Sequence, residues 1–354
     1  MENMQTKVER GKGLINIEMP PVIFGTSSLG NLFEALTAET KLGIVKECVH
    51  LSKEPVVFDS AGKYGAGMAL EVLGQCLKQL NVGQEDVMIS NKLGWLRTEL
   101  KTAEPTFEPG VWKDLENDAV QKISYDGIME CFEQGNELLN GYIPQLLSVH
   151  DPDEYLATAT DEQEAQQFYE NILDAYEALF DLKQQGKVKG IGVGARDWRM
   201  IQRISGDVAL DWVMIANSMT IKTHPRELFN FIRELHQKGV YVINSAVFHS
   251  GFLVGGDYYD YRQVKRGPPA NDALFEWRKT FFEVCRDFAV KPAAACVQFA
   301  LHVPGVKSIA LNTSDEIRVK ENLEMAELEL PVEFWETLHT KGLIHENVIH
   351  TLPV

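Results

Sequence analysis

The chain has 354 residues, with 34 basic and 51 acidic side chains and a formal net charge of −17 at pH 7. This balance disfavours nucleic acid as a partner, because nucleic-acid binding depends on lysines and arginines that neutralise phosphates. With 45% hydrophobic and 24% charged residues, the composition is that of a globular protein, which excludes collagen-like and disordered chains.

No segment has the pattern of a targeting or membrane-spanning sequence. Residues Met1 to Met19 carry charges throughout and lack the apolar run of a signal peptide, and no later segment approaches about 20 apolar residues. We therefore expect a cytoplasmic protein with no membrane partner. The five cysteines are widely spaced without a C-x-x-C pair, which indicates reduced core residues rather than a disulfide framework or a zinc site.

Short runs rich in valine, isoleucine and leucine alternate with longer amphipathic stretches along the chain. This alternation is typical of a parallel sheet built from βα units. Eight such units without a linker between them favour one closed (β/α)8 TIM barrel over an open doubly wound sheet. We therefore predict a single domain over residues 1–354, with the barrel at about 20–330. The predicted strands are Val22 to Gly25, Val56 to Ala61, Val87 to Leu93, Leu146 to His150, Val188 to Gly194, Trp212 to Asn217, Val240 to Ala246 and Ser308 to Asn312.

Helices are expected between these strands. The T-x-x-E sequence of Thr313 and Glu316 predicts a capping box at the last barrel helix, and Gly186 and Gly239 lie where helix C-caps belong. An extra C-terminal helix is expected from Pro331 onward. The other expected helices cover residues 38–51 after Thr37, 67–80, 125–140, 162–185 and 226–238.

Two connections, 95–124 and 248–271, are too long for ordinary βα loops, and both follow a strand. In a barrel, the loops after strands form the face on which active sites are built.

Three ionisable residues lie at the predicted carboxyl ends of neighbouring strands. Asp59, Lys92 and His150 are in the second, third and fourth strands, and Tyr64 follows Asp59 in a glycine-rich loop. Each residue taken alone is more typical of a polar group satisfied at a strand end, but together they predict one catalytic pocket. A neighbouring Lys92 ammonium would lower the pKa of the Tyr64 phenol from about 10, and Asp59 would fix Lys92. His150 would orient a substrate oxygen.

The order of these motifs resembles that of the aldo-keto reductase family. The segments FGTSSLG, FDSAGKYG followed by E-x-x-L-G, the strand ending in Lys92, LLSVHDPD and LNTSDEIRVKENLE occur in the family's order over roughly residues 20 to 340. The resemblance implies an NAD(P)-dependent oxidoreductase with Asp59, Tyr64, Lys92 and His150 as the catalytic tetrad. Tyr64 would be the acid or base, and hydride would pass to or from C4 of the nicotinamide.

The resemblance also implies a cofactor site, in which this sequence departs from the family. In the family a Lys-Ser pair and an Arg hold the 2′-phosphate of NADP, and here these positions are Asn312, Thr313 and Arg318, which favours NAD as the cofactor over NADP. The Ser-Asn pair that holds the nicotinamide carboxamide is Gly194 and Ala195 here. The stacking aromatic is Ser245, for which Phe248 is a candidate replacement. The remaining implied contacts are Gly25, Thr26, Ser27, Asn217, Ser250, Gly251, Glu321 and Asn322.

Within the family, the G-V-G of the fifth strand, VFHSGFL and FGTSSLGNLF are most similar to bacterial aldose 1-dehydrogenases acting on L-fucose and related D-threo sugars, and to pyridoxal 4-dehydrogenases. This similarity implies oxidation of the C1 hydroxyl of an aldose to a lactone. The 95–124 insertion, with Trp95, Arg97, Phe107 and Trp112, is a candidate platform for the sugar, and Trp95 is the predicted substrate contact. A surface excursion packed on the barrel rim is equally open.

Other functions remain open. They are an NADPH-dependent carbonyl or aldehyde reductase, a pyridoxal 4-dehydrogenase, and a non-catalytic nicotinamide-binding sensor or partner subunit, to which the departures at Gly194, Ala195 and Ser245 point. The G-x-G-x-x-A pattern of Gly190, Gly192 and Ala195 is a weak dinucleotide fingerprint, since its glycines lie within a strand. No histidine spacing indicates a metal site, and the oligomeric state is left open.

Overall fold

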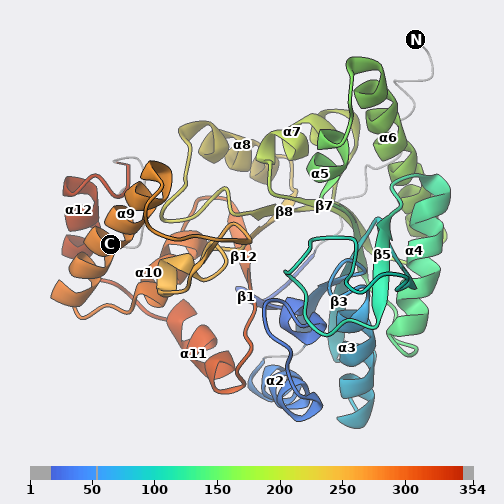
Figure 1. Ribbon diagram of the computed structural model, residues 1–354, viewed down its shortest axis with the longest axis horizontal. Coiled ribbons are helices and arrows are strands. Elements are labelled where there is room, and N and C mark those ends of the chain that lie inside the picture. Colours follow the sequence, from blue (N-terminus) through green and yellow to red (C-terminus); the bar gives the residue numbers. More distant parts are fainter. Residues whose placement is uncertain (1–16, 53–54, 346–354) are drawn as a thin grey trace.

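The computed structural model describes residues 17–52 and 55–345, in which eight parallel strands close into a barrel surrounded by helices (Figure 1). Around the barrel the strand order is β1, β12, β9, β8, β7, β6, β3 and β2. The predicted (β/α)8 barrel is confirmed, and every strand boundary lies within two residues of its expected position. The strands are β1 Val22–Gly25, β2 Val56–Ala61, β3 Val87–Leu93, β6 Leu146–His150, β7 Gly190–Ala195, β8 Trp212–Ala216, β9 Tyr241–Ser245 and β12 Val306–Leu311.

The helices begin and end at signals that the sequence carries. The Thr37 side chain accepts a hydrogen bond from the Thr40 N–H at the start of α2, and Gly186 and Gly239 follow α6 and α8 with φ of +70° and +77°. The helix expected after Pro331 is α12. The bounds are η1 Ser27–Gly30, α2 Ala38–Leu51, α3 Met68–Gln79, α4 Tyr125–Leu138, α5 Pro152–Ala157, α6 Glu162–Gln184, α7 Trp198–Asp207, α8 Arg226–Gln237, α9 Pro269–Asp287, α10 Pro292–Leu301, α11 Ile317–Ala326 and α12 Val332–Thr340.

None of the described helices is long and apolar enough to cross a membrane. Residues 1–16 lie outside the described residues. They make up most of the N-terminal stretch in which the sequence predicted no targeting signal.

Helix α11 starts differently from the prediction. Thr313 Oγ1 accepts a hydrogen bond from the N–H of Asp315 at 3.1 Å, and Glu316 is the N-cap residue without a capping bond from its side chain. The Asp315 carboxylate accepts a bond from the N–H of Ile317 at 3.0 Å. The predicted capping box of Thr313 and Glu316 is therefore wrong, because the threonine hydroxyl closes a tight turn that ends before the helix begins.

The two long connections contain small antiparallel sheets. In the first, β4 Trp95–Glu99 pairs with β5 Asn117–Gln121, and in the second, β10 Tyr258–Tyr259 pairs with β11 Arg262–Gln263 after the short helix η2 Phe252–Val254. The sequence did not predict these hairpins. Their strands are short. Most residues of β4 are half-buried, so the strand has no fully buried face, and its sequence therefore lacks the alternation of apolar and polar residues that would have predicted it.

The barrel interior leaves no room for a side chain at Gly192 of β7. A Cβ atom there would lie 2.5 Å from ring atoms and from the carbonyl oxygen of Trp212, which is fully buried. We expect Gly192→Ala to lower the free energy of unfolding by about 1–3 kcal/mol, because a crowded core must shift to accept the methyl group. Urea denaturation followed by circular dichroism measures this change.

Gly206→Ala is the matched control for this variant. A Cβ atom at Gly206, in helix α7, would meet no atom within 4 Å. Alanine also has the higher helix propensity, so the free energy of unfolding should stay the same or rise by up to about 1 kcal/mol. Equal destabilisation by the two variants would contradict the packing argument.

Candidate active site

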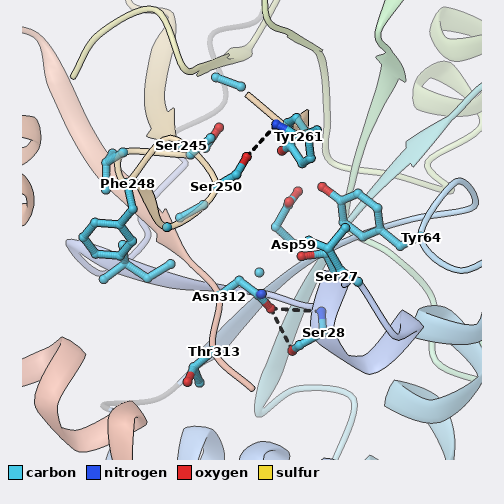
Figure 2. Close-up of a pocket in the computed structure, with 18 of the residues that line it drawn as sticks. Ser27, Ser28, Asp59, Tyr64, Ser245, Phe248, Ser250, Tyr261, Asn312 and Thr313 are labelled. Carbon is cyan, nitrogen blue, oxygen red and sulfur yellow. Dashed lines mark hydrogen bonds between the residues drawn. The ribbon is translucent and has the colours of Figure 1, made fainter. Parts of the chain in front are cut away.

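A cavity of about 600 Å³ opens where the carboxyl ends of the strands meet both insertions. Its walls carry Glu108 and Trp112 from the first insertion and Phe248 and Tyr261 from the second. In Figure 2, Asp59 and Tyr64 face the cavity from one side and Phe248 from the other, with Asn312 bonded to Ser28 between them. The volume is typical of a pocket for a small organic ligand.

A buried ion pair lies in the wall of this cavity. The β2–β3 register sets Asp59 opposite Ser90, and Lys92 Nζ lies 2.5 Å from Asp59 Oδ2. The other carboxylate oxygen of Asp59 accepts a hydrogen bond from Ser90 Oγ at 3.2 Å. Both charged side chains are only 3% exposed. Each charge is therefore compensated by the other, which is the condition for stable burial.

Tyr64 and His150 lie beside this pair. The two ring centroids are 5.6 Å apart with the rings nearly perpendicular, and Lys92 Nζ lies 4.7 Å from the centroid of the Tyr64 ring. His150 Nδ1 is buried and has no hydrogen-bond partner among the described residues. The four residues predicted to form the catalytic tetrad thus come together at one wall of the cavity.

The pKa of Tyr64 differs from the expectation. Burial, followed by the negative charges of Asp59 and Asp151, raises the pKa of the phenol well above its usual value. The Lys92 ammonium is bound to Asp59, so its charge is largely compensated and does not offset the burial. The predicted lowering of the Tyr64 pKa by Lys92 is therefore wrong for this structure, and Tyr64 is protonated at neutral pH.

The pKa of His150 moves in the opposite direction. Burial lowers it to about 3, against the opposing charge of Asp151. The imidazole is therefore neutral at physiological pH and can form a hydrogen bond with a substrate oxygen without carrying a charge.

Most residues implied at the cofactor site line the cavity: Gly25, Ser27, Gly194, Ser245, Phe248, Ser250, Gly251, Asn312, Thr313, Arg318, Glu321 and Asn322. Thr26 is buried behind the wall, where its hydroxyl lies 2.8 Å from Ser60 Oγ and 3.1 Å from the Asp59 carbonyl oxygen. Asn217 follows the lining residue Ala216 in the chain. Within the described part of the chain, both amide atoms of Asn217 are buried without a partner.

These residues fit a nicotinamide dinucleotide. The unpartnered amide of Asn217 offers the donor and acceptor that a carboxamide requires. A Cβ atom at Gly251 would meet nothing within 4 Å, so there is space beside this stretch of backbone in the wall. Arg318 adds a cation in the same cavity.

The predicted substrate contact Trp95 does not line the cavity. Its ring centroid lies 5.7 Å from that of Phe107 and 5.2 Å from the Lys63 ammonium. Arg97, from the same insertion, binds Glu71 at 2.8 Å. Trp112 is the insertion's tryptophan that reaches the cavity, with its ring centroid 5.9 Å from that of Tyr64. Of these two tryptophans, Trp112 and not Trp95 therefore faces the cavity, because the Trp95 ring is held beneath Lys63.

Sequence reasoning missed a charged group in the cavity wall. Lys63 Nζ lies 3.0 Å from Glu108, 2.9 Å from Asp151 and 2.7 Å from Glu154. A signal was available, since Lys63 and Asp151 are the chain neighbours of Tyr64 and His150. The partner Glu108 could not be found this way, because it comes from an insertion without a regular pattern.

The comparisons with known proteins agree with this geometry. The family model described as the aldo/keto reductase family matches residues 21–342. A pyridoxal 4-dehydrogenase of Microbacterium luteolum is 27% identical, covering 97% of this chain and 99% of its own length. A D-threo-aldose 1-dehydrogenase of a Pseudomonas species is 24% identical, covering 96% and 99%. An L-galactose dehydrogenase of Arabidopsis thaliana is 23% identical, covering 90% and 88%.

Two solved structures have the same fold. An aldo-keto reductase of Bacillus halodurans in its holo form gives a TM-score of 0.68 at 19% identity, covering 96% of this chain and 97% of its own. A glycerol dehydrogenase of Gluconobacter oxydans gives a TM-score of 0.66 at 13% identity, covering 96% and 95%.

The protonated state of Tyr64 predicts different pH profiles for the two directions of a proton transfer. A reaction in which Tyr64 donates a proton should change by less than about two-fold in kcat between about pH 6 and about pH 8, because neither the phenol nor His150 titrates there. The reverse reaction, in which Tyr64 accepts a proton, should become faster as pH rises, because the phenolate fraction grows. Initial rates in both directions measure this, and a reverse rate that is flat up to about pH 9 would contradict the raised pKa.

Proposed function

Because this chain belongs to the aldo/keto reductase family, we propose that it oxidises the C1 hydroxyl of an aldose, L-fucose or a related D-threo-aldose, to a lactone with NAD. The assembly of Asp59, Tyr64, Lys92 and His150 around one cavity carries this proposal. Aldo-keto reductases use NAD(P)H, and the oxidised nicotinamide, when bound, supplies the hydride acceptor and a positive charge. The name of the D-threo-aldose relative supports the substrate class.

Each residue of the tetrad has one task in this reaction. The ionised form of Tyr64, a minor fraction at neutral pH, takes the proton of the sugar hydroxyl, and the neutral imidazole of His150 holds the reacting oxygen by a hydrogen bond. Lys92, fixed by Asp59, keeps a positive charge beside the phenol when Tyr64 is ionised. Because burial opposes ionisation of Tyr64, the residues alone favour the direction in which Tyr64 donates its proton.

The wall beside the tetrad suits a substrate rich in hydroxyl groups. Trp112 presents an aromatic ring, and Glu108, Asp151 and Arg196 add hydrogen-bond acceptors and donors to the same cavity. A site of one apolar surface with a few fixed polar groups binds and orients a polar ring compound.

The residues that replace the family's phosphate-binding set support NAD. Asn312 has a neutral side chain and supplies no cation at this position. Its Oδ1 accepts hydrogen bonds from the Ser28 N–H at 3.1 Å and from Ser28 Oγ at 2.8 Å. Arg318 is 65% exposed and its Nε lies 3.8 Å from Asp315 Oδ2. A 2′-phosphate would therefore meet one exposed arginine whose charge is already shared with a carboxylate.

The test combines a substrate panel with Tyr64→Phe. We expect purified protein to reduce NAD with L-fucose or a related D-threo-aldose. Tyr64→Phe should lower kcat by about 10²-fold or more without weakening NAD binding, because general acid–base catalysis contributes this much. Tyr125→Phe is the control, since that hydroxyl bonds Asp181 on the surface and should leave the rates unchanged. Absorbance of the reduced nicotinamide measures turnover.

The other outcomes select other functions. Turnover with pyridoxal instead of sugars would favour the activity named for the 27% identical relative. Reduction of aldehydes with NADPH and no sugar oxidation would favour a carbonyl reductase. Cofactor binding with no turnover on any substrate would favour a sensor and would overturn the proposal.

The cofactor preference has its own test in Asp315→Asn. Removing this carboxylate should raise kcat/KM for NADP about two- to five-fold and leave kcat/KM for NAD unchanged, because an exposed ion pair with Arg318 is worth only a few tenths to about 1 kcal/mol. Asparagine keeps the bond to the Ile317 N–H, so the start of helix α11 is preserved. Glu324→Gln, on the same helix, is the control. Equal changes for both cofactors would argue against a role of Asp315.

A further inference from the structure

Lys63 has an unusual environment for a lysine. Its side chain is 4% exposed, and its ammonium binds three carboxylates, those of Glu108, Asp151 and Glu154, at 3.0, 2.9 and 2.7 Å. These partners come from different segments, Glu108 from the first insertion and the other two from the segment after β6. One buried cation thus joins three parts of the cavity mouth: the loop that carries Tyr64, the insertion and the start of helix α5.

The bond to Asp151 connects the chain neighbours of two catalytic residues. Lys63 precedes Tyr64, and Asp151 follows His150. The Asp151 backbone has a φ of +48°, a left-handed conformation that is unfavourable for a residue with a side chain, and its N–H donates to the Gly194 carbonyl at 2.9 Å. Asp151 is therefore held firmly, and the Lys63–Asp151 bond restrains the distance between the Tyr64 and His150 backbones.

The bond to Glu108 extends this restraint to the aromatic wall. Glu108 Oε2 accepts a hydrogen bond from Trp112 Nε1 at 2.7 Å, and the Trp112 ring lies beside that of Tyr64. Below the ammonium lies the Trp95 ring, 5.2 Å away. The orientation of Trp112, like that of Tyr64, therefore depends on the same cation.

We infer that Lys63 is a positioning residue that fixes Tyr64 against His150 through Asp151 and sets the Trp112 wall through Glu108. The inference rests on the proposed function, because it concerns the same site. Lys63 moves no proton in the reaction. Its task is to hold the acid/base phenol and the imidazole at the separation that the reaction needs, and displacements of about 1 Å at such a site slow reactions about 10²-fold.

Lys63 also contributes to the charge state of His150. Burial has the largest effect on this imidazole and lowers its pKa. The negative charge of Asp151 raises the pKa, and the positive charges of Lys92, Lys63 and Arg196 lower it further. Tyr64 is a further titratable neighbour, packed edge-on against the ring. Loss of the Lys63 charge removes one cation and leaves the Asp151 carboxylate without its nearest partner, and both changes raise the pKa of His150.

The experiment compares Lys63→Met, Lys63→Arg and Lys183→Met with the wild type. Lys183 is the matched control, because it binds Asp211 at 2.7 Å with both side chains largely buried, and Asp211 lies just before β8, away from the cavity. Lys63→Met should lower kcat about 10- to 100-fold with the Kd for NAD within about two-fold. In the direction in which Tyr64 donates a proton, the kcat of this variant should fall at acidic pH where that of the wild type does not. Lys63→Arg should restore the wild-type pH profile, because the guanidinium keeps the charge and can bind the same carboxylates.

Titration of the His150 imidazole by nuclear magnetic resonance provides a readout that needs no substrate. In Lys63→Met the imidazole should titrate at a higher pH than in the wild type, and in Lys183→Met it should not move. If the wild type oxidises no sugar, the proposed function fails, but this titration still tests Lys63. A Lys63→Met variant with wild-type kcat, or with a slowed kcat but unchanged pH profile and unchanged His150 titration, would overturn the inference.

Discussion

The buried ion pair of Asp59 and Lys92 is the interaction on which the cavity depends. Neither charge is stable in the barrel interior without the other. The β2–β3 register sets Asp59 opposite Ser90, two residues before Lys92, and the long lysine side chain reaches back to the carboxylate. The pair also limits its neighbours. A Cβ atom at Gly194 would lie 3.0 Å from Lys92 Cδ, closer than an ordinary contact, so a side chain at this position would displace the lysine.

Burial then decides the protonation of the groups that do the chemistry. It raises the pKa of Tyr64 and lowers that of His150, so both side chains are neutral at physiological pH although charged groups surround them. The charges themselves are paired within the wall, Lys92 with Asp59 and Lys63 with its three carboxylates. The two side chains assigned to proton transfer and substrate orientation are thus neutral, and the ions in the same wall are held in fixed positions by their partners.

The sequence predicted what depends on local periodicity and on strand ends. The eight barrel strands and the convergence of Asp59, Lys92 and His150 followed from the βα alternation, because parallel strands bring their carboxyl ends together. The sequence could not predict side-chain positions in segments without a regular hydrophobic pattern, such as the first insertion. The sequence placed both Trp95 and Trp112 in a candidate platform but chose Trp95 as the contact, because only the fold of the first insertion decides which ring faces the cavity. The pKa shift of Tyr64 was misjudged because burial, which outweighs a neighbouring charge here, is a property of the whole packing.

The departure from the family pattern at Gly194, in β7, has a different meaning once its neighbours are known. Read alone, Gly194 in place of a serine suggests that a cofactor contact has been lost. In the structure, a side chain there would press on Lys92, so the glycine preserves the tetrad. The unpartnered amide of Asn217, next to the lining residue Ala216, offers the hydrogen-bonding groups that a carboxamide would need. The Asp59–Lys92 pair thus stays in place beside Tyr64 and His150, which is the arrangement that the proposed acid–base chemistry needs.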